Sequence, residues 1–242
     1  MTHFTASEST KIFAHRGRTQ GGAPENSLRA FRDAIDAKAH GIEFDIRRTK
    51  DNILICVHDP DIFGVPVSQL SWSDIECLNK THHLEIPTLE EILIRLPNTI
   101  RLDMEIKIPD IVDSAVRTAL SHRPPNSFVV TSFLDSAIKT IKREHPEIRA
   151  GLILGEKNPK PYFKTRLSEL YPQHRLRDAN ADFVVPHWRL LKLSFLKRMD
   201  RGGWPVWLWT VNAPRHLQRW LNRPEIEVVI SDNVTVCQQA LQ

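Results

Sequence analysis

The chain has 242 residues, of which 41% are hydrophobic and 26% charged, and its formal net charge is +4. This length is normal for a single α/β barrel domain. No apolar run approaches the roughly 20 residues of a membrane-spanning helix, so we expect no transmembrane segment. Positions 1–10 lack the apolar region of a secretory signal, and we expect a flexible leader, one domain over residues 11–242 and a cytoplasmic location.

The cysteines and the basic charge narrow the class of protein further. Cys56, Cys77 and Cys237 are odd in number, far apart and without zinc-ligand spacing, which indicates free thiols in a reducing compartment. A positive net charge suits nucleic acid, an anionic membrane surface or an anionic substrate. The basic residues between positions 160 and 201 are interleaved with acidic ones and form no aromatic and basic platform. We interpret them as an ordinary solvated surface and expect no nucleic-acid partner.

The chain begins with the pattern of a strand, a loop and a helix. Residues 11–15 form a short apolar run that ends in polar groups, which is typical of a strand that delivers side chains into a loop. A turn follows at 21–24. Asn26 or Ser27 then caps a helix whose apolar residues share one face and which ends near residue 38.

The segment 41–59 carries the most unusual pattern in the sequence. Residues 41–47 alternate between apolar and charged side chains with a period of two, which predicts a strand with one charged face. If residues 50–52 form a turn, residues 54–58 return antiparallel and place Val57 or His58 beside Asp45. An amphipathic hairpin at a solvent-exposed sheet edge would show the same alternation, so the rest of the chain must decide.

The remaining segments continue an alternation of strands and helices. Strands are predicted to start near residues 11, 41, 100, 127, 149, 182, 205 and 226. Beside the first helix, helices are predicted over about 72–78, 89–96, 110–121, 136–144, 190–201, 214–222 and 234–241, with at least one more before residue 180 and an irregular segment at 64–70. This order predicts an α/β fold, a (β/α)8 TIM-type barrel with a β-hairpin arm, residues 54–58, after the second strand.

The barrel topology makes the charged strand faces informative. Residues 102–108 repeat the alternation seen in 41–47. Strands of a barrel are normally apolar on both faces because the lumen is packed core. Inward-facing Glu43, Asp45, Glu105 and Lys107 therefore favour a functional site at the C-terminal mouth, and the buried carboxylates require a compensating cation.

Six short motifs occur in one order along the chain. They are His15-Arg16-Gly17, Pro24-Glu25-Asn26-Ser27, Glu43-x-Asp45, His58-Asp59, Glu105-x-Lys107 and Trp209-Thr210-Val211-Asn212. Together they closely resemble the glycerophosphodiester phosphodiesterase family, and the resemblance spans nearly the whole chain. It implies a metal-dependent barrel enzyme that acts on small-molecule glycerophosphodiesters and releases glycerol 3-phosphate and an alcohol.

The resemblance also implies roles for individual residues. His15 and His58 correspond to the family's paired histidines, the general acid and base. The metal-binding carboxylates correspond to Glu43, Asp45 and Glu105, and the phosphate contacts correspond to Arg16 and Lys107. Trp209 is interpreted either as barrel packing or as part of the substrate pocket, whereas Asn26 is interpreted as a helix cap.

The proposed chemistry needs these residue types. A phosphodiester repels nucleophiles, so a divalent cation with Arg and Lys must neutralise the charge that develops on the phosphoryl oxygens. An all-oxygen ligand set suits Ca²⁺ or Mg²⁺. Histidine titrates near neutrality, so one imidazole can accept a proton while the other donates one.

Two other functions remain open from the sequence. A phospholipase D-like reaction would act on lysophospholipids or sphingolipids through a cyclic phosphate, and the spider-venom type of sphingomyelinase has a similar His, Glu-x-Asp, His pattern. The absence of paired cysteines and the presence of the block 24–27 argue against it. A non-catalytic phosphate-binding module would normally have lost a histidine or a carboxylate, and none is lost here.

Overall fold

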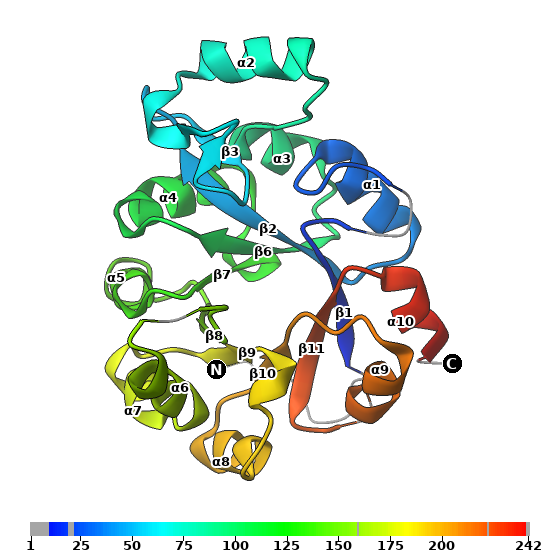
Figure 1. Cartoon of the computed structure of the whole chain (residues 1–242), viewed down its shortest axis with the longest axis vertical. Helices are drawn as coiled ribbons and strands as arrows, with labels where there is room; N and C mark the ends of the chain where they lie inside the picture. The colour runs from blue at the N-terminus through cyan, green and yellow to red at the C-terminus, as the bar shows by residue number, and fades with distance from the viewer. Residues whose placement is uncertain (1–9, 19–21, 159, 222, 241–242) are drawn as a thin grey trace.

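A computed structural model describes residues 10–18, 22–158, 160–221 and 223–240. In these residues eight parallel strands close into a barrel with the neighbour order β1-β11-β10-β9-β8-β7-β6-β2, and β2 pairs back to β1 (Figure 1). The strands are β1 (Lys11–His15), β2 (Gly41–Arg48), β6 (Arg101–Ile106), β7 (Phe128–Ser132), β8 (Ala150–Leu154), β9 (Phe183–Pro186), β10 (Val206–Leu208) and β11 (Ile226–Ser231). The predicted barrel and its eight strands are confirmed.

Helices surround the barrel, and most of them bury apolar residues against its outer side (Figure 1). They are α1 (Leu28–Asp36), α3 (Leu89–Arg95), α4 (Val112–His122), α5 (Asp135–Glu144), α6 (Tyr162–Leu170), α7 (Gln173–Asp178), α8 (Phe195–Gly202), α9 (Pro214–Trp220) and α10 (Val234–Ala240). The predicted continuous helix over 190–201 is wrong. A single 3-10 turn, η4 (Trp188–Leu190), precedes α8, and positive φ angles at Leu193 and Ser194 interrupt the helical backbone between them.

The predicted hairpin arm is confirmed. Strand β3 (Leu54–Cys56) runs antiparallel to β2, with Arg47 opposite Ile55. Asn52 supplies the turn with φ of 67°, a conformation that asparagine tolerates better than most residues. The segment that was expected to be irregular contains strand β5 (Val65–Pro66), which pairs with β4 (Asp61–Ile62), and a 3-10 turn, η1 (Val67–Gln69). The helix predicted over 72–78 is present as α2 (Trp72–Thr81).

The barrel lumen has two chemically different halves. Strands β1, β8, β9, β10 and β11 fill one half with apolar side chains, which form the cluster Phe13, Ile153, Phe183, Val185, Trp207, Val228 and Ile230. Strands β2 and β6 fill the other half with buried carboxyl groups, namely Glu43, Asp45, Asp103 and Glu105. Their alternate residues, such as Phe44 and Met104, join the core between barrel and helices. The strict alternation in the sequence therefore separates the packed core from the charged lumen.

Aromatic packing closes the apolar half of the lumen. The ring centroids of Phe183 and Trp207 lie 4.5 Å apart, and those of Phe13 and Trp207 lie 5.0 Å apart. Gly151 makes room for this cluster, because a Cβ at that position would lie 2.3 Å from the Phe183 ring. The close packing of these rings fills one half of the lumen and holds the strands in place around the charged half.

The start of the described chain is attached to the barrel. Thr10 is buried, and its hydroxyl donates a hydrogen bond to the Leu221 carbonyl at 2.5 Å. Residues 1–9, which make up the rest of the predicted leader, lie outside the described residues. Among the residues that are described, no helix combines the length and the apolar character needed to cross a lipid bilayer.

We predict that Phe183→Ala lowers the free energy of unfolding by about 3–5 kcal/mol, because it removes a fully buried ring from a close-packed lumen. Urea unfolding followed by circular dichroism measures this loss. Phe163→Ala is the matched control, since the Phe163 ring is 87% exposed and its removal should change stability by less than about 0.5 kcal/mol. Equal losses in the two variants would contradict the assignment of Phe183 to the core.

Candidate active site

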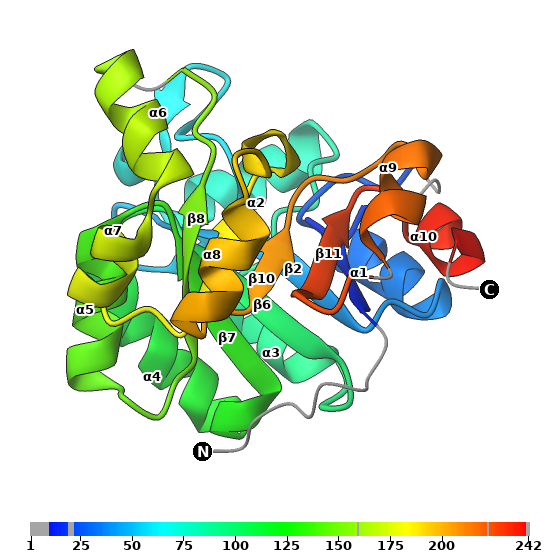
Figure 2. The ribbon, with the colours of Figure 1, turned by 90° about the horizontal axis from the view of Figure 1, so that it is seen from below.

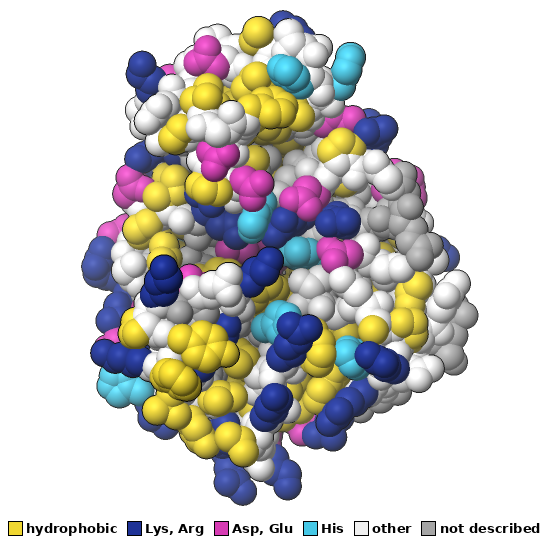
Figure 3. Space-filling model, viewed as in Figure 1, with side chains coloured by type: hydrophobic (Ala, Val, Ile, Leu, Met, Phe, Trp, Pro, Cys, Tyr) yellow, Lys and Arg dark blue, Asp and Glu magenta, His cyan; other side chains and the backbone are white. Residues whose placement is uncertain are grey.

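A cavity of about 340 Å³ opens among the loops that follow the barrel strands. Like the lumen, the cavity has one charged side and one apolar side. One side consists of charged and polar side chains, His15, Arg16, Glu43, His58, Asp103, Glu105, Lys107 and Thr131. The other side includes Phe133, Ile153, Val185, Trp209 and Ile230. Histidine and charged side chains accordingly gather at the centre of the face seen in Figure 3. A polar wall facing an apolar wall suits a ligand with one charged and one less polar end.

The loop after β1 places Arg16 over the carboxylates of β2. Arg16 and Gly17 have positive φ angles of 54° and 69°, which turn the chain sharply after His15. The Arg16 backbone N–H then donates a hydrogen bond to Glu43 Oε2 at 3.0 Å. The Arg16 guanidinium lies 3.2 Å from Asp45 Oδ2. Position 17 requires glycine because a Cβ there would lie 2.3 Å from the Phe31 ring.

Asn26 belongs to the site and does not cap the helix, so the interpretation as a helix cap is wrong. Its side-chain N–H donates to Asp45 Oδ2 at 2.9 Å, and its Oδ1 accepts from the Asp45 backbone N–H at 3.3 Å. The Cys56 thiol also lies 3.3 Å from Asn26 Oδ1. Ser27 caps α1, since its hydroxyl accepts from the Ala30 N–H at 3.1 Å. Asn26 therefore fixes the orientation of Asp45.

The three predicted metal-binding carboxylates converge. One oxygen from each of Glu43, Asp45 and Glu105 lies within 4.8 Å of the others. Glu43 and Glu105 line the cavity, whereas Asp45 is fully buried beneath it. The Lys107 ammonium contacts Asp45 Oδ1 at 2.7 Å and Glu105 Oε1 at 2.5 Å. The predicted phosphate contact Lys107 is thus brought together with the carboxylates.

Electrostatics divide these acids into two kinds. Burial raises the pKa of the Glu43 and Glu105 carboxyls, and the neighbouring carboxylates raise it further. Burial acts in the same direction on Asp45, but Lys107 and Arg16 outweigh it and hold the pKa of Asp45 below its ordinary value. The site therefore has too little positive charge for all of its acids.

The carboxylate group fits a bound divalent cation. Glu43 Oε1 is buried and has no hydrogen-bond partner among the described residues. Carboxylate oxygens at these separations are the ligands that Ca²⁺ and Mg²⁺ prefer. A cation at this point would also supply the charge that Lys107 alone does not provide.

Asp103 is a further buried acid that sequence reasoning left without a role. Its Oδ1 accepts a hydrogen bond from the Thr131 hydroxyl at 2.7 Å, and its Oδ2 has no partner among the described residues. Burial raises the pKa of Asp103 to about 8. At neutral pH it is therefore largely a neutral carboxylic acid, which adds little to the negative charge of the lumen.

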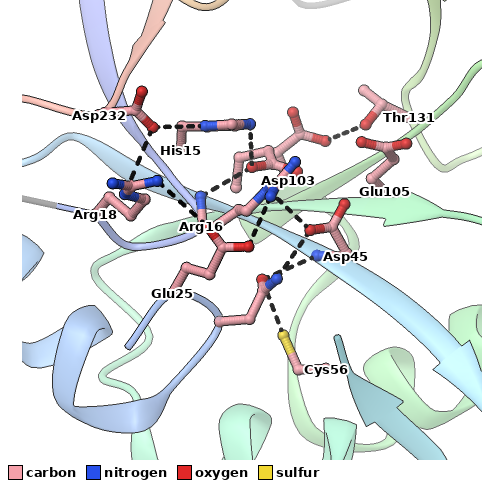
Figure 4. A network of polar contacts seen from close by, with 12 residues as sticks. His15, Arg16, Arg18, Glu25, Asp45, Cys56, Asp103, Glu105, Thr131 and Asp232 are labelled. Atoms are coloured by element: carbon pink, nitrogen blue, oxygen red, sulfur yellow. Dashed lines mark hydrogen bonds and ion pairs between the residues drawn. The ribbon is translucent and has the colours of Figure 1, made fainter. Parts of the chain in front are cut away.

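His15 is oriented by residues from the opposite end of the chain (Figure 4). Its Nδ1 lies 2.7 Å from Asp232 Oδ1, while its Nε2 faces Glu43 Oε2 at 4.0 Å. Asn212 holds Asp232, donating to Asp232 Oδ2 at 2.6 Å and accepting from the Asp232 backbone N–H at 2.9 Å. Burial would raise the pKa of Asp232, but hydrogen bonding and charge from His15 hold it below its ordinary value.

Asp232 was missed as a site residue by sequence reasoning. It directly follows β11, and β11 pairs with β1, so closure of the barrel places it beside His15. Two features of the sequence point to Asp232: it lies at the end of the last strand, and Asn212 closes the motif that begins at Trp209. Neither feature shows that Asp232 contacts His15, because that contact depends on the pairing of the first and last strands.

His58 lies at the outer edge of the cavity, on the arm. Its Nδ1 lies 2.8 Å from Asp59 Oδ1, and its carbonyl accepts a hydrogen bond from Arg47 Nε at 2.9 Å. The Val57 N–H donates to the Asp45 carbonyl at 3.2 Å, so the hairpin carries His58 toward the carboxylates as predicted. Burial lowers the pKa of His58 below the ordinary histidine value.

Trp209 packs within the barrel and also lines the cavity. Its ring lines the cavity and lies edge-on to Phe133, with centroids 5.6 Å apart. Its indole N–H lies within hydrogen-bond distance of the Leu154 and Val185 carbonyls, at 3.1 and 3.0 Å. These contacts fix one apolar wall of the cavity.

The chain is similar to known proteins over almost its whole length. The sequence model of the Glycerophosphoryl diester phosphodiesterase family matches residues 15–236. A probable glycerophosphodiester phosphodiesterase 2 of Mycobacterium tuberculosis is 26% identical over 94% of this chain and 89% of its own length. A glycerophosphodiester phosphodiesterase of Caldanaerobacter subterraneus is 22% identical over 93% and 94%.

Solved structures share the fold. A glycerophosphodiester phosphodiesterase from Parabacteroides distasonis superposes with a TM-score of 0.81, at 24% identity and 97% coverage of both chains. A phosphodiesterase from Oleispira antarctica, solved in complex with the product sn-glycerol-3-phosphate, has a TM-score of 0.80 at 20% identity, with 96% of this chain and 97% of that chain covered. The chain therefore belongs to the glycerophosphoryl diester phosphodiesterase family and is an enzyme of that class.

Proposed function

We propose that this enzyme hydrolyses water-soluble glycerophosphodiesters to glycerol 3-phosphate and an alcohol, using a bound divalent cation and two histidines. The observation that carries the proposal is the convergence of three carboxylates in a cavity that His15 and His58 also line. The Oleispira antarctica phosphodiesterase was solved with sn-glycerol-3-phosphate, which supports the same product here.

Glu43, Asp45 and Glu105 would hold the cation. Bound Ca²⁺ or Mg²⁺ supplies positive charge that stabilises the phosphoryl oxygens as negative charge develops on them. Arg16 and Lys107 add fixed cationic groups at the same side of the cavity. Both side chains are held in place by Asp45, so they act as preorganised donors and do not need to be ordered when substrate binds.

The two histidines have matching surroundings. Each has a carboxylate oxygen within 2.8 Å of Nδ1, Asp232 for His15 and Asp59 for His58. When Nδ1–H donates to that carboxylate, the neutral ring keeps Nε2 as a proton acceptor, and the protonated ring offers Nε2–H as a donor. One ring can therefore take the proton of the nucleophile while the other protonates the oxygen that leaves phosphorus.

The apolar wall fits the less polar part of the substrate. Phe133, Ile153 and Trp209 face the charged wall across the cavity. A phosphate held on the charged side leaves its alcohol substituent beside these side chains. The cavity volume of about 340 Å³ is small enough to favour a soluble diester over a substrate with long acyl chains inside it.

We predict that His15→Ala and His58→Ala each lower kcat on glycerophosphocholine by at least about 100-fold, because proton transfer acts in the transition state. Phosphorus NMR follows the reaction and separates glycerol 3-phosphate from the cyclic phosphate of a phospholipase D-like route. His174→Ala, at an exposed position of α7, is the control and should keep normal turnover. A variant at position 15 or 58 with near-normal kcat and normal Tm would show that its histidine is structural.

We predict that Ca²⁺ or Mg²⁺ raises the Tm of the chelator-treated protein, because a ligand that binds only the native state stabilises it by about 2.7 kcal/mol at 100 times its Kd. Glu105→Gln should reduce this increase, since it removes one charged ligand. Glu76→Gln, at an exposed position of α2, should leave the increase unchanged. The metal assignment fails if millimolar cation leaves Tm unaltered and exhaustive chelation leaves hydrolysis unaltered.

We predict that the His58 imidazole titrates below the ordinary histidine value of about 6.5, because burial disfavours the charged ring. The hydrogen bond to Asp59 raises its pKa, so Asp59→Asn should move the titration lower still. NMR of the ring protons across a pH series measures both values. A midpoint above 6.5, or an upward shift in the variant, would contradict the described environment.

A further inference from the structure

Helix α6 turns its apolar side chains toward the solvent. Tyr162, Phe163 and Leu167 are all exposed, and the Phe163 ring is 87% accessible. Glu169 is the one buried residue of α6, every residue of which the structure describes. This arrangement reverses the usual pattern, in which the apolar face of a helix packs on the core. Large exposed aromatic side chains that form a continuous patch indicate an interaction surface.

The exposed apolar surface continues beyond α6. Tyr171 follows the helix, and Leu193 lies 63% exposed in the segment before α8. Arg198 joins these two segments, because its guanidinium donates to the Leu170 carbonyl at 2.8 Å and to the Leu193 carbonyl, and it lies 4.6 Å from the centroid of the Tyr171 ring. We use the name α6 patch for Tyr162, Phe163, Leu167, Tyr171 and Leu193.

The α6 patch lies on the same side of the molecule as the active-site cavity. In Figure 2, α6 projects beyond the barrel at the upper left, above strand β8, which precedes it in the chain. Yellow side chains also gather over α6, at the lower left of the face that shows the cavity in Figure 3. A planar partner on the α6 patch would therefore face the mouth of the cavity.

A set of hydrogen bonds fixes α6 to the loop that lines this cavity. Arg166 donates to Glu169 Oε2 at 2.6 Å and to the Glu156 carbonyl at 2.5 Å. Glu169 Oε1 accepts the Gly155 N–H at 2.8 Å. Glu156 and Lys157 themselves line the cavity. The buried ion pair holds the exposed aromatic side chains at a fixed position relative to the site.

Basic residues surround the α6 patch. Between positions 157 and 199 the sequence has ten Lys and Arg residues and three acidic residues, Glu169, Asp178 and Asp182. Each of these acids forms an ion pair, with Arg166, Lys139 and Lys142 respectively. The exposed apolar surface is therefore set in positive charge. The earlier interpretation of this region as an ordinary solvated surface does not account for the aromatic side chains.

We propose that the α6 patch docks the enzyme on an anionic phospholipid surface. Aromatic side chains at the boundary between headgroups and acyl chains, with lysines and arginines beside them, are the combination that binds such surfaces. The charge complementarity favours a lipid surface over a second copy of this chain, which would bring the same basic residues together. The proposal goes beyond the hydrolysis of soluble diesters, and it is measured without substrate.

Sedimentation with vesicles tests the proposal. The protein should bind vesicles of equal parts phosphatidylglycerol and phosphatidylcholine, and should bind pure phosphatidylcholine vesicles at least about tenfold more weakly. Phe163→Ser combined with Leu167→Ser should weaken binding to the anionic vesicles at least about tenfold. Ile94→Ser on α3 is the matched control, since Ile94 is 63% exposed and lies outside the patch, and binding should be unchanged.

Several results would overturn the proposal. They are absence of binding to the anionic vesicles, binding that the double variant does not weaken, or an equal loss in the Ile94→Ser variant. Light scattering supplies a further test, because a dimer that the double variant abolishes would assign the patch to a second copy of this chain. Hydrolysis of soluble glycerophosphocholine should be normal in the double variant, so loss of catalysis and loss of docking are separate readouts.

Discussion

The site depends on the cost of burying carboxylates side by side in the barrel lumen. Glu43, Asp45 and Glu105 face one another where water is scarce, and burial of each charge is unfavourable unless a positive group compensates it. Lys107 compensates Asp45 best, which is why the pKa of Asp45 falls while those of the two glutamates rise. The unpaired Glu43 oxygen marks the place where a cation would complete the balance. The same imbalance that opposes burial of these carboxylates would therefore favour binding of a cation.

This charged half can exist because the other half of the lumen is a conventional core. Phe183 and Trp207 pack against Phe13 and hold the strands together while β2 and β6 contribute polar groups. The loops beyond the strands then add the reactive side chains. Closure of the barrel between β1 and β11 brings Asp232 to His15, and the antiparallel arm brings His58. Different strands of one sheet thus provide the packed core and the polar groups of the site.

The strand pattern was predictable because each strand has a short, strict periodicity, and the hairpin was predictable because too few residues separate Asp45 from residue 54 for a crossover. Details that depend on tertiary neighbours were not predictable. Asn26 and Ser27 are both good caps, and only the position of Asp45 decides which one belongs to the site. Asp232 could be placed beside His15 only once the pairing of the first and last strands was known. The outward orientation of α6 depends on the buried Glu169, which a count of apolar residues does not reveal.

Location of the cation in a crystal tests the central claim most directly. Crystals soaked with Mn²⁺, a substitute for Mg²⁺ with strong anomalous scattering, should show one principal anomalous peak bounded by Glu43, Asp45 and Glu105. The structure contains a second group of suitable side chains, Asp113, Glu144 and His145, on the outside of the barrel. A peak at that second group with none in the lumen would contradict the account, because the buried carboxylates would then be balanced without a metal.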